Sequence, residues 1–355
     1  HILTYYKEYR DEQKKIRGNE LYYDTMWWKL NIFNFKILES IKTTELTNHI
    51  IKKINNTDIS LYSCNPNICL YKNKIYIHQR WVNYYYNKTG HREINPAKWI
   101  SLNSRFNLDN TFHKIENEIF IDDDLSLYKG NHIGFEDIRV YNYKGTLYYI
   151  ACILDDNRKI TSVTSDVYDI KNEEFKLNKK IIIPTFYPIN KRRVEKNWVF
   201  FPYKNELCVV YNWYPLQICK IDYHENKLNL KKINYDMDLY FKDTKGSSCG
   251  VVYNNYIWFI LHKSQKNAFT QRPNCFQSAH HYQHFFAIFD LDMNLIRYTE
   301  TFKLHEDYVE FCTGFIIKDD KMIISYGASD CKSFVSIYSL SYIKNELYWY
   351  KPDIN

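Results

Sequence analysis

The stretch Gly134-Phe135-Glu136-Asp137-Ile138-Arg139-Val140-Tyr141-Asn142-Tyr143-Lys144-Gly145-Thr146-Leu147-Tyr148-Tyr149-Ile150 contains a complete unit of strand, turn and strand. Two runs rich in Val, Ile and Tyr flank the short polar turn at Lys144-Gly145, which is the pattern of a β-hairpin. Glu and Asp are poor strand formers, so the pair Glu136-Asp137 at the start of the first strand favours a functional site. A surface turn with an ion-paired Arg139 is the simpler alternative.

The unit of strand, polar turn and strand recurs along the chain. Its copies are centred on turns near residues 73, 144, 204, 254 and 319. The 50 to 71 residues between successive turns leave room for two further strands in each repeat. Such an arrangement is typical of an all-β fold, a five-bladed β-propeller. A pair of β-sandwiches would be less regular, and a Rossmann fold needs a glycine fingerprint that this sequence lacks.

Residues 1–58 differ from the rest because they mix charged and aromatic residues without the repeated unit. We expect them to form a partly helical N-terminal extension, with a helix around Glu45–Ile54. Residues 59–355 are expected to form the propeller, which is the catalytic domain. A chain of 355 residues, 45% of them hydrophobic, can bury a large core. No run of 18 apolar residues occurs, so no membrane segment is predicted.

The charge indicates which kind of ligand the protein binds, and the cysteine content indicates the cellular compartment. The net charge is +7, with lysine and arginine scattered along the chain. This balance favours a phosphate-bearing small ligand, and no nucleic-acid partner is predicted. Nine cysteines occur without a Cys-x-x-Cys motif, which indicates reduced thiols and a cytoplasmic, reducing compartment. His280, His281 and His284 have no carboxylate or cysteine at ligand spacing, so neither a metal nor another cofactor is predicted.

Short polar clusters precede the first strand of every repeat. They are Asn65-Pro66-Asn67, Glu136-Asp137-Ile138-Arg139, Glu195-Lys196-Asn197-Trp198, Gly246-Ser247-Ser248 and Glu310-Phe311-Cys312-Thr313-Gly314. Equivalent ends of inner strands converge around the channel of a propeller, so these clusters are expected to surround one pocket. Arg80, Asn212, His262 and Asp330 follow second strands and are expected to form an outer shell, with a surface role as the alternative for each.

These motifs, in this order, resemble glycoside hydrolase family 130 and the related β-mannosyltransferases of glycosyltransferase family 108. The resemblance covers roughly residues 60–345 and rests on Gly134-x-Glu136-Asp137-x-Arg139, Lys196-Asn197-Trp198, Gly246-Ser247-Ser248, His262 and Tyr326-Gly327-Ala328-Ser329-Asp330. It implies a five-bladed propeller that acts on β-mannosides, in many members as a phosphorylase.

The resemblance also implies roles for individual residues. Asp137 matches the catalytic acid of the family, and Asp330 matches the carboxylate that holds the reacting sugar. Arg139 and Lys196 match basic positions near the phosphate. Ile138 stands where the family usually has proline, which is a departure in the backbone beside Asp137.

The chemistry of these residues fits a reaction that needs a single carboxylate. Inverting hydrolysis requires both an acid and a base. Phosphorolysis, or transfer from a phosphate-bearing donor, needs one carboxylate together with cations that hold the phosphate. Glu136 and Glu195 are the candidates for the base of a hydrolase, but each adjoins a cation in the sequence.

We therefore predict an inverting mannosyltransferase that uses GDP-mannose or mannose 1-phosphate as donor and an oligosaccharide as acceptor. Asp137 is the predicted catalytic residue. The predicted substrate-binding residues are Asn65, Arg80, Glu136, Arg139, Glu195, Lys196, Asn197, Ser247, His262 and Asp330. A β-mannoside phosphorylase or hydrolase, and a catalytically silent glycan-binding propeller, are the alternatives.

Overall fold

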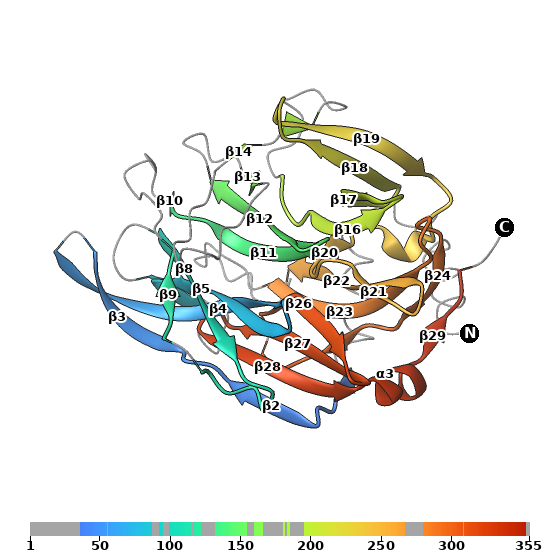
Figure 1. The fold of residues 1–355 in the computed structure, drawn as a ribbon. Helices are drawn as coiled ribbons and strands as arrows, with labels where there is room; N and C mark the ends of the chain where they lie inside the picture. The colour runs from blue at the N-terminus through green and yellow to red at the C-terminus, as the bar shows by residue number, and fades with distance from the viewer. Residues whose placement is uncertain are drawn as a thin grey trace, which may run out of the picture.

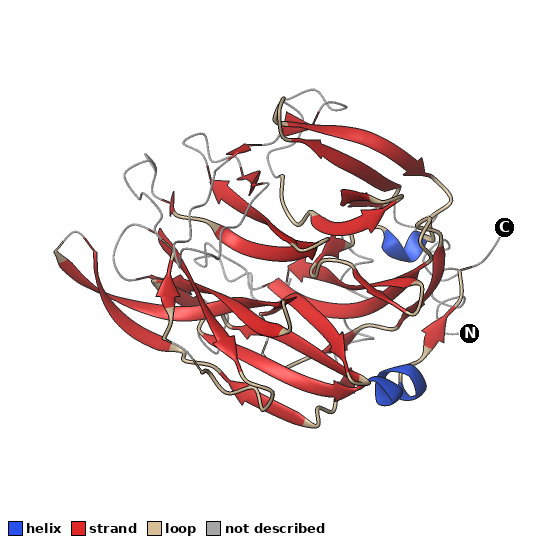
Figure 2. Cartoon of the chain, viewed as in Figure 1, coloured by secondary structure: helices blue, strands red, loops and turns tan. Residues whose placement is uncertain are grey.

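The structure is a computed structural model that describes residues 36–54, 56–86, 92–94, 99–115, 117–121, 132–154, 160–165, 180–181, 183–184, 195–266, 280–307 and 309–352. The described chain is nearly all β, as predicted (Figure 2). Its helical elements are η2 (Leu239–Phe241) and α3 (Leu340–Glu346). Among the described residues, no helix is long and apolar enough to cross a membrane.

Five sheets of four to eight strands form the body (Figure 1), and we name each after one of its strands. The β4 sheet contains β3 (His49–Ile54), β4 (Thr57–Tyr71), β5 (Lys74–Val82), β8 (Trp99–Leu108), β9 (Ile119–Phe120) and β10 (His132–Ile133). The β11 sheet contains β11 (Glu136–Tyr143), β12 (Thr146–Leu154), β13 (Ile160–Ser165) and β14 (Lys180–Ile181). The β16 sheet contains β15 (Ile183–Pro184), β16 (Val199–Tyr203), β17 (Glu206–Trp213), β18 (Leu216–Asp222) and β19 (Lys227–Asn234).

The other two large sheets include strands from both ends of the described chain. The β22 sheet contains β1 (Lys36–Ile37), β20 (Lys245–Gly246), β21 (Val251–Tyr253), β22 (Tyr256–Lys266), β23 (His280–Phe289), β24 (Leu295–Thr299), β25 (Phe302–Lys303) and β29 (Trp349–Tyr350). The β26 sheet contains β2 (Lys42–Glu45), β26 (Glu310–Lys318), β27 (Lys321–Ala328) and β28 (Lys332–Ser339). A small sixth sheet pairs β6 (Tyr84–Tyr86) with β7 (Arg92–Ile94).

All five predicted hairpins are present, as β4–β5, β11–β12, β16–β17, β21–β22 and β26–β27. Each turn has two central residues, and both have a positive φ, which is the geometry of a type I′ turn. These residues are Lys72 and Asn73, Lys144 and Gly145, Lys204 and Asn205, Asn254 and Asn255, and Asp319 and Asp320. Asn, Asp and Gly adopt this conformation most readily, so the local sequence determined the hairpins.

The helix predicted around Glu45–Ile54 is wrong. His49–Ile54 is strand β3, which pairs antiparallel with β4, and Lys42–Glu45 is strand β2, which pairs with β28. Exposed and half-buried residues alternate along β3, with Ile50 and Ile54 packed against the core, so the period is two rather than 3.6. Residues 36–54 thus add strands to the main sheets. Residues 1–35 lie outside the described part, and the domain boundary at residue 58 stays a prediction.

Five hydrophobic clusters each contain residues from two of the large sheets. One pair from each cluster is Cys69 and Val140, Ile150 and Phe200, Phe201 and Phe259, Trp258 and Tyr326, and Ile68 and Ile316. The eight described cysteines are free thiols, and seven of them are buried. The core therefore lies between the sheets, and their closure into a five-bladed propeller stays a prediction.

The start of β11 is fixed by a close approach of backbone to backbone at Gly134. Gly134 has a φ of +90°, and a Cβ there would lie 1.8 Å from the carbonyl oxygen of Ser101. The next residue, Phe135, accepts hydrogen bonds through its carbonyl from Ser101 Oγ at 2.6 Å and Asn103 Nδ2 at 3.1 Å. Glycine is needed here both for its conformation and for its lack of a side chain.

We expect Gly134→Ala to lower the free energy of unfolding by about 3 kcal/mol or more, because a methyl group must displace the β8 backbone. Gly145→Ala is the matched control, since Gly145 also has a positive φ but nothing lies within 4 Å of its Cβ position. It should cost only about 1 kcal/mol of conformational strain. Urea denaturation monitored by tryptophan fluorescence gives both values. Equal losses in the two variants would contradict this account.

Candidate active site

Asp137 and Asn65 occupy similar irregular positions in two inner strands, Asp137 at the start of β11 and Asn65 in the middle of the long strand β4. Asp137 has a φ of 52° and lies in a bulge of β11 between Glu136 and Arg139. Asn65 has a φ of 46° and lies in a bulge of β4 between Cys64 and Asn67. Asp and Asn tolerate this left-handed conformation better than most residues. The bulges turn both side chains out of the regular ladder, so they meet between the two sheets.

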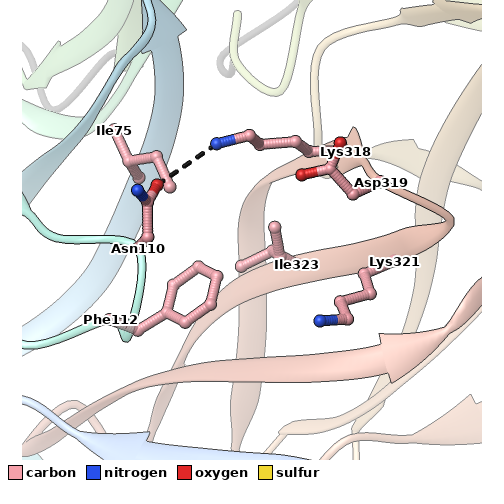
Figure 3. A pocket seen from close by; sticks show the side chains of 7 residues that line it. All are labelled: Ile75, Asn110, Phe112, Lys318, Asp319, Lys321 and Ile323. Atoms are coloured by element: carbon pink, nitrogen blue, oxygen red, sulfur yellow. Dashed lines mark hydrogen bonds between the residues drawn. The ribbon is translucent and has the colours of Figure 1, made fainter.

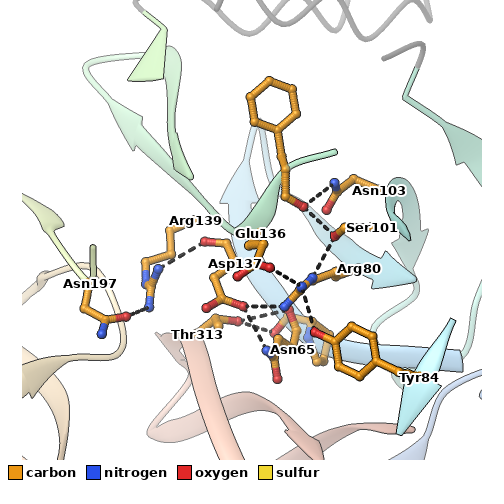
Figure 4. A network of polar contacts seen from close by, with 12 residues as sticks. Asn65, Arg80, Tyr84, Ser101, Asn103, Glu136, Asp137, Arg139, Asn197 and Thr313 are labelled. Atoms are coloured by element: carbon orange, nitrogen blue, oxygen red, sulfur yellow. Dashed lines mark hydrogen bonds and ion pairs between the residues drawn. The ribbon is translucent and has the colours of Figure 1, made fainter. Parts of the chain in front are cut away.

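The Asp137 carboxylate is buried, with 9% of the residue exposed, and is held by two donors (Figure 4). Asn65 Nδ2 donates to Oδ1 at 2.9 Å, and Arg80 Nη1 donates to the same oxygen at 3.1 Å. Burial is the largest influence and acts to raise the pKa of this carboxyl. The charges of Arg80, Arg139 and Lys196, with the hydrogen bond from Asn65, outweigh burial, so the pKa is lowered and Asp137 is ionised at neutral pH.

Arg80 lies at the centre of this cluster, although the sequence placed it in an outer shell. Its side chain is buried and, besides Asp137, pairs through Nη2 with Glu136 Oε1 at 3.2 Å. Nη2 also donates to the Tyr84 hydroxyl at 3.0 Å, and Nε donates to Ser101 Oγ at 2.8 Å. The guanidinium is therefore fixed by four partners and can hold Asp137 in one orientation (Figure 4).

Arg139 joins three sheets. It is 1% exposed and donates through Nη1 to the carbonyl of Asp137 at 3.0 Å and through Nε to the carbonyl of Ser247 at 2.6 Å. Nη2 donates to Asn197 Oδ1 at 3.4 Å, and the guanidinium lies 5.5 Å from the centre of the Phe311 ring. Its donors thus face protein acceptors, which gives Arg139 a role in holding the site together. Phosphate binding by this residue stays a prediction.

Lys196 and His262 lie beside this junction. The charge of Lys196 acts on both Asp137 and His262, and its half-buried ammonium has no hydrogen bond or ion pair with the residues that the structure describes. His262 Nδ1 is 2.7 Å from Ser247 Oγ. Burial above all, and then the neighbouring charges of His284, Lys245, Arg139 and Lys196, lower the pKa of His262 well below its ordinary value. Its imidazole is therefore neutral, and Lys196 is the cation suited to an incoming anion.

Glu195 and Asp330 complete the predicted set. Glu195 Oε1 accepts a hydrogen bond from the Tyr211 hydroxyl at 3.0 Å, so this carboxylate has a structural partner. Asp330 lies between β27 and β28, with a φ of 52°. Its charge acts on Tyr84 and Cys64, which belong to the surroundings of Arg80. The predicted residues therefore lie toward the end of the sheets that is opposite the five hairpin turns.

Several residues of the cluster carried no signal in the sequence. Tyr84 and Ser101 bind Arg80, but each comes from another strand and belongs to no motif. Thr313 was part of a predicted polar cluster, and its hydroxyl donates to the carbonyl of Pro66 at 2.8 Å. Only the folding of the chain brings Tyr84 and Ser101 to Arg80, which holds Asp137.

A second buried polar pair lies in the β22 and β26 sheets. His284 Nδ1 is 3.1 Å from Glu310 Oε1, and His284 Nε2 accepts from the Cys312 amide at 3.1 Å. Glu310 also accepts from the amides of Leu304 and His305, each at 2.8 Å. These groups satisfy one another, which indicates a structural pair. In the described part of the chain no three His, Cys, Asp or Glu residues form a metal-binding group, and the side chains of His280 and His281 lie outside that part.

Solved structures of carbohydrate-active proteins share the fold of this chain. A β-1,2-mannobiose phosphorylase from Listeria innocua, in complex with β-1,2-mannobiose, matches with a TM-score of 0.55 and 13% identity, over 86% of this chain and 99% of that chain. A mannose phosphorylase from Leishmania mexicana, in complex with phosphate, matches with a TM-score of 0.54 and 11% identity, over 94% of this chain and 98% of that chain. A GDP-mannose-dependent mannosyltransferase from Leishmania mexicana matches with a TM-score of 0.51 and 11% identity, over 89% of this chain and 94% of that chain.

No protein-family model and no curated protein matches the sequence. At identities of 11–13%, the likeness to the solved structures establishes the fold alone. The predicted resemblance to glycoside hydrolase family 130 and to the related β-mannosyltransferases is confirmed at this level.

We expect the difference in unfolding free energy between the wild type and Asp137→Asn to depend on pH. The folded pKa of Asp137 lies below the unfolded value of about 3.9, so the ionised carboxylate contributes stability above that value and loses it as the pH falls through the folded pKa. As the pH rises from about 2 to about 5, the free energy of unfolding of the wild type should therefore increase relative to that of the variant. Above about pH 5 the difference should stay constant.

Urea titrations at several pH values measure this difference. The same comparison in an Arg80→Met background is the control, because removal of the closest cation should narrow the difference. A difference that is independent of pH, or unaffected by Arg80→Met, would show that Asp137 is not held ionised by these neighbours.

Proposed function

We propose that this chain is an inverting mannosyltransferase that transfers mannose from GDP-mannose or mannose 1-phosphate to a hydroxyl of an oligosaccharide acceptor. The observation that carries the proposal is the geometry of the Asp137 carboxylate, which is buried, held through Oδ1 by Asn65 and Arg80, and kept ionised by the neighbouring cations, so that it can accept a proton. Transfer to a hydroxyl requires such a base, whereas cleavage of a mannoside begins with an acid. The shared fold with a GDP-mannose-dependent mannosyltransferase supports the same proposal.

The proposed fold of the catalytic domain is a five-bladed propeller whose blades are the five large sheets. The five hydrophobic clusters support it, because they join the β4, β11, β16, β22 and β26 sheets in sequence and return to the first. Asn67 of β4 supports the closure, since it bonds the Thr313 carbonyl at 2.8 Å on one side and the Val140 amide at 2.9 Å on the other. The site would then lie where the inner strands begin.

In the proposed reaction Asp137 accepts the proton of the acceptor hydroxyl. Both hydrogen bonds from Asn65 and Arg80 end on Oδ1, so Oδ2 is the oxygen available for that proton. The acceptor oxygen forms a bond to C1 of mannose as the bond from C1 to the phosphate oxygen breaks, with inversion at C1. Lys196 is proposed to hold the departing phosphate, because its ammonium is the cation beside Asp137 that is free of the described side chains.

A β-mannoside phosphorylase is the second candidate. Asp137 would then act as the acid, and a bound phosphate anion would favour its protonation by offsetting the nearby cations. The shared fold with two phosphorylases supports this alternative. A hydrolase is less well supported, because Glu136 is paired with Arg80 and Glu195 accepts from Tyr211, so both candidate bases already have partners.

NMR product analysis with GDP-mannose or mannose 1-phosphate and short mannoside acceptors tests the proposal. We expect a β-mannoside to form, and Asp137→Asn to slow its formation by about 100-fold to 10,000-fold. Asp319→Asn makes the same chemical change at an exposed hairpin turn and should keep full activity. Consumption of the product on addition of phosphate would identify a phosphorylase. Glycan binding without turnover of either donor would contradict both candidates and favour a silent glycan-binding protein.

Lys196→Met and Arg139→Met should have different effects. Lys196→Met should raise KM for the phosphate-bearing donor by about tenfold or more, with a much smaller loss of stability than Arg139→Met, because the Lys196 ammonium makes no hydrogen bond or ion pair with the described residues. Arg139→Met should lower the free energy of unfolding by about 3 kcal/mol, because it leaves the carbonyls of Asp137 and Ser247 and the half-buried Asn197 Oδ1 without this donor. Steady-state kinetics and thermal melting distinguish them. An unaltered KM in Lys196→Met would exclude it from the donor site.

A further inference from the structure

In three of the five hairpins the first strand ends in a tyrosine, and a lysine is the first central residue of the turn. The pairs are Tyr71-Lys72, Tyr143-Lys144 and Tyr203-Lys204, and each lysine ammonium lies over the ring of its tyrosine, at 5.2, 5.1 and 5.3 Å from the ring centre. At the β21–β22 turn, which is the fourth along the chain, the ammonium of Lys344 of α3 lies 5.3 Å from the centre of the Tyr253 ring. The catalytic proposal makes no use of this repeated arrangement.

The turns lie together at one end of the molecule. Asn142 Nδ2 donates to the carbonyl of Leu70 at 3.2 Å, and Lys144 Nζ donates to that of Asn205 at 3.1 Å. On the other side, the Tyr253 hydroxyl donates to Asp320 Oδ1 at 3.3 Å. Asp137 is near the first residue of β11 and these turns follow the last, so the two groups lie at opposite ends of the strands. We call the group of five turns the turn face.

The turn face is basic. Lys72, Lys74, Lys144, Lys204 and Lys321 are exposed, and Lys318 is half-buried. The acidic residues in these turns are Asp319 and Asp320. Glu206, just after one turn, is paired with Lys220 and Lys231. Among the described residues, further carboxylates at this end lie in the outer turns, at Asp109, Asp222, Glu225, Asp290 and Asp292, and beside or in α3, at Glu39 and Glu346. Positive charge therefore predominates over the inner hairpins.

Apolar groups lie among these lysines. A cavity of about 320 Å³ lies between the β26–β27 turn and the loop after β8 (Figure 3). Its apolar wall consists of Ile75, Phe112 and Ile323, and Lys318 and Lys321 stand beside it. The fourth turn lacks lysine, but next to it Val252 is 48% exposed and Tyr256 is 42% exposed.

We propose that the turn face docks on an anionic phospholipid bilayer, with the cavity accepting part of one lipid. Lysines spread over the ends of several sheets, with apolar side chains between them, match a broad anionic surface that has an apolar interior. A single-stranded nucleic acid fits less well, because it needs open aromatic faces for stacking. Here Tyr203 is buried, Tyr71 and Tyr143 are half-buried, and a lysine covers each ring. This inference does not depend on the catalytic proposal.

Vesicle co-sedimentation of the full chain tests the inference. We expect the protein to sediment with vesicles of phosphatidylcholine containing about 30 mol % phosphatidylserine, and not with phosphatidylcholine alone. The triple variant Lys72→Gln, Lys144→Gln and Lys204→Gln should bind about 100-fold more weakly, because each lysine near an anionic bilayer contributes about a fivefold factor. Raising the salt concentration should weaken the binding of the wild type.

The matched control is Lys53→Gln, Lys242→Gln and Lys332→Gln, three exposed lysines outside the turn face with the same total change in charge. It should bind the vesicles as the wild type does, and circular dichroism should show that both triple variants are folded. Equal losses in the two triples would overturn the proposal, as would equal binding to the two kinds of vesicle. Binding to a single-stranded oligonucleotide but not to vesicles would also overturn it, as would release from vesicles by millimolar inorganic phosphate at constant ionic strength.

Discussion

The candidate site depends on the hydrogen bonds that the buried guanidinium of Arg139 donates. This side chain starts on β11 and reaches acceptors just before β16 and just after β20, so one cation links three neighbouring sheets at their ends. A guanidinium removed from water is stable only where its donors are met, and here two backbone carbonyls and an amide oxygen meet them. The position of Asp137 follows, because the carbonyl of that residue is one of these acceptors.

The charge of Asp137 is a property of its surroundings and not of the residue. Burial alone would favour the neutral acid, and the opposite result depends on cations from three different segments together with an amide from a fourth. The same arrangement makes the carboxylate sensitive to any anion that enters the site, because an added negative charge opposes the effect of the cations. A group with this balance can serve as a base in one direction of a reaction and as an acid in the other.

The two ends of the sheets differ in backbone geometry, although the same strands form both. Away from the hairpin turns, bulges with the left-handed residues Asn65 and Asp137 interrupt the ladder and direct polar side chains between the sheets. At the hairpin turns, pairs of left-handed residues close each β-hairpin with no interruption, and the side chains there point to solvent. The candidate site thus lies where the backbone is irregular, and a broad charged surface is formed where the backbone is regular.

The sequence by itself determined the five hairpins and the polar clusters before them, because a period of two and a pair of turn residues are local properties. It failed at His49–Ile54, where six residues were too short a pattern and pairing with β4 decided for a strand. Only the tertiary structure decided that Arg80 holds Asp137 and is itself held by Tyr84 and Ser101, and that Arg139 is buried. Charge state and burial depend on groups distant in the chain, and these come together only when the sheets pack.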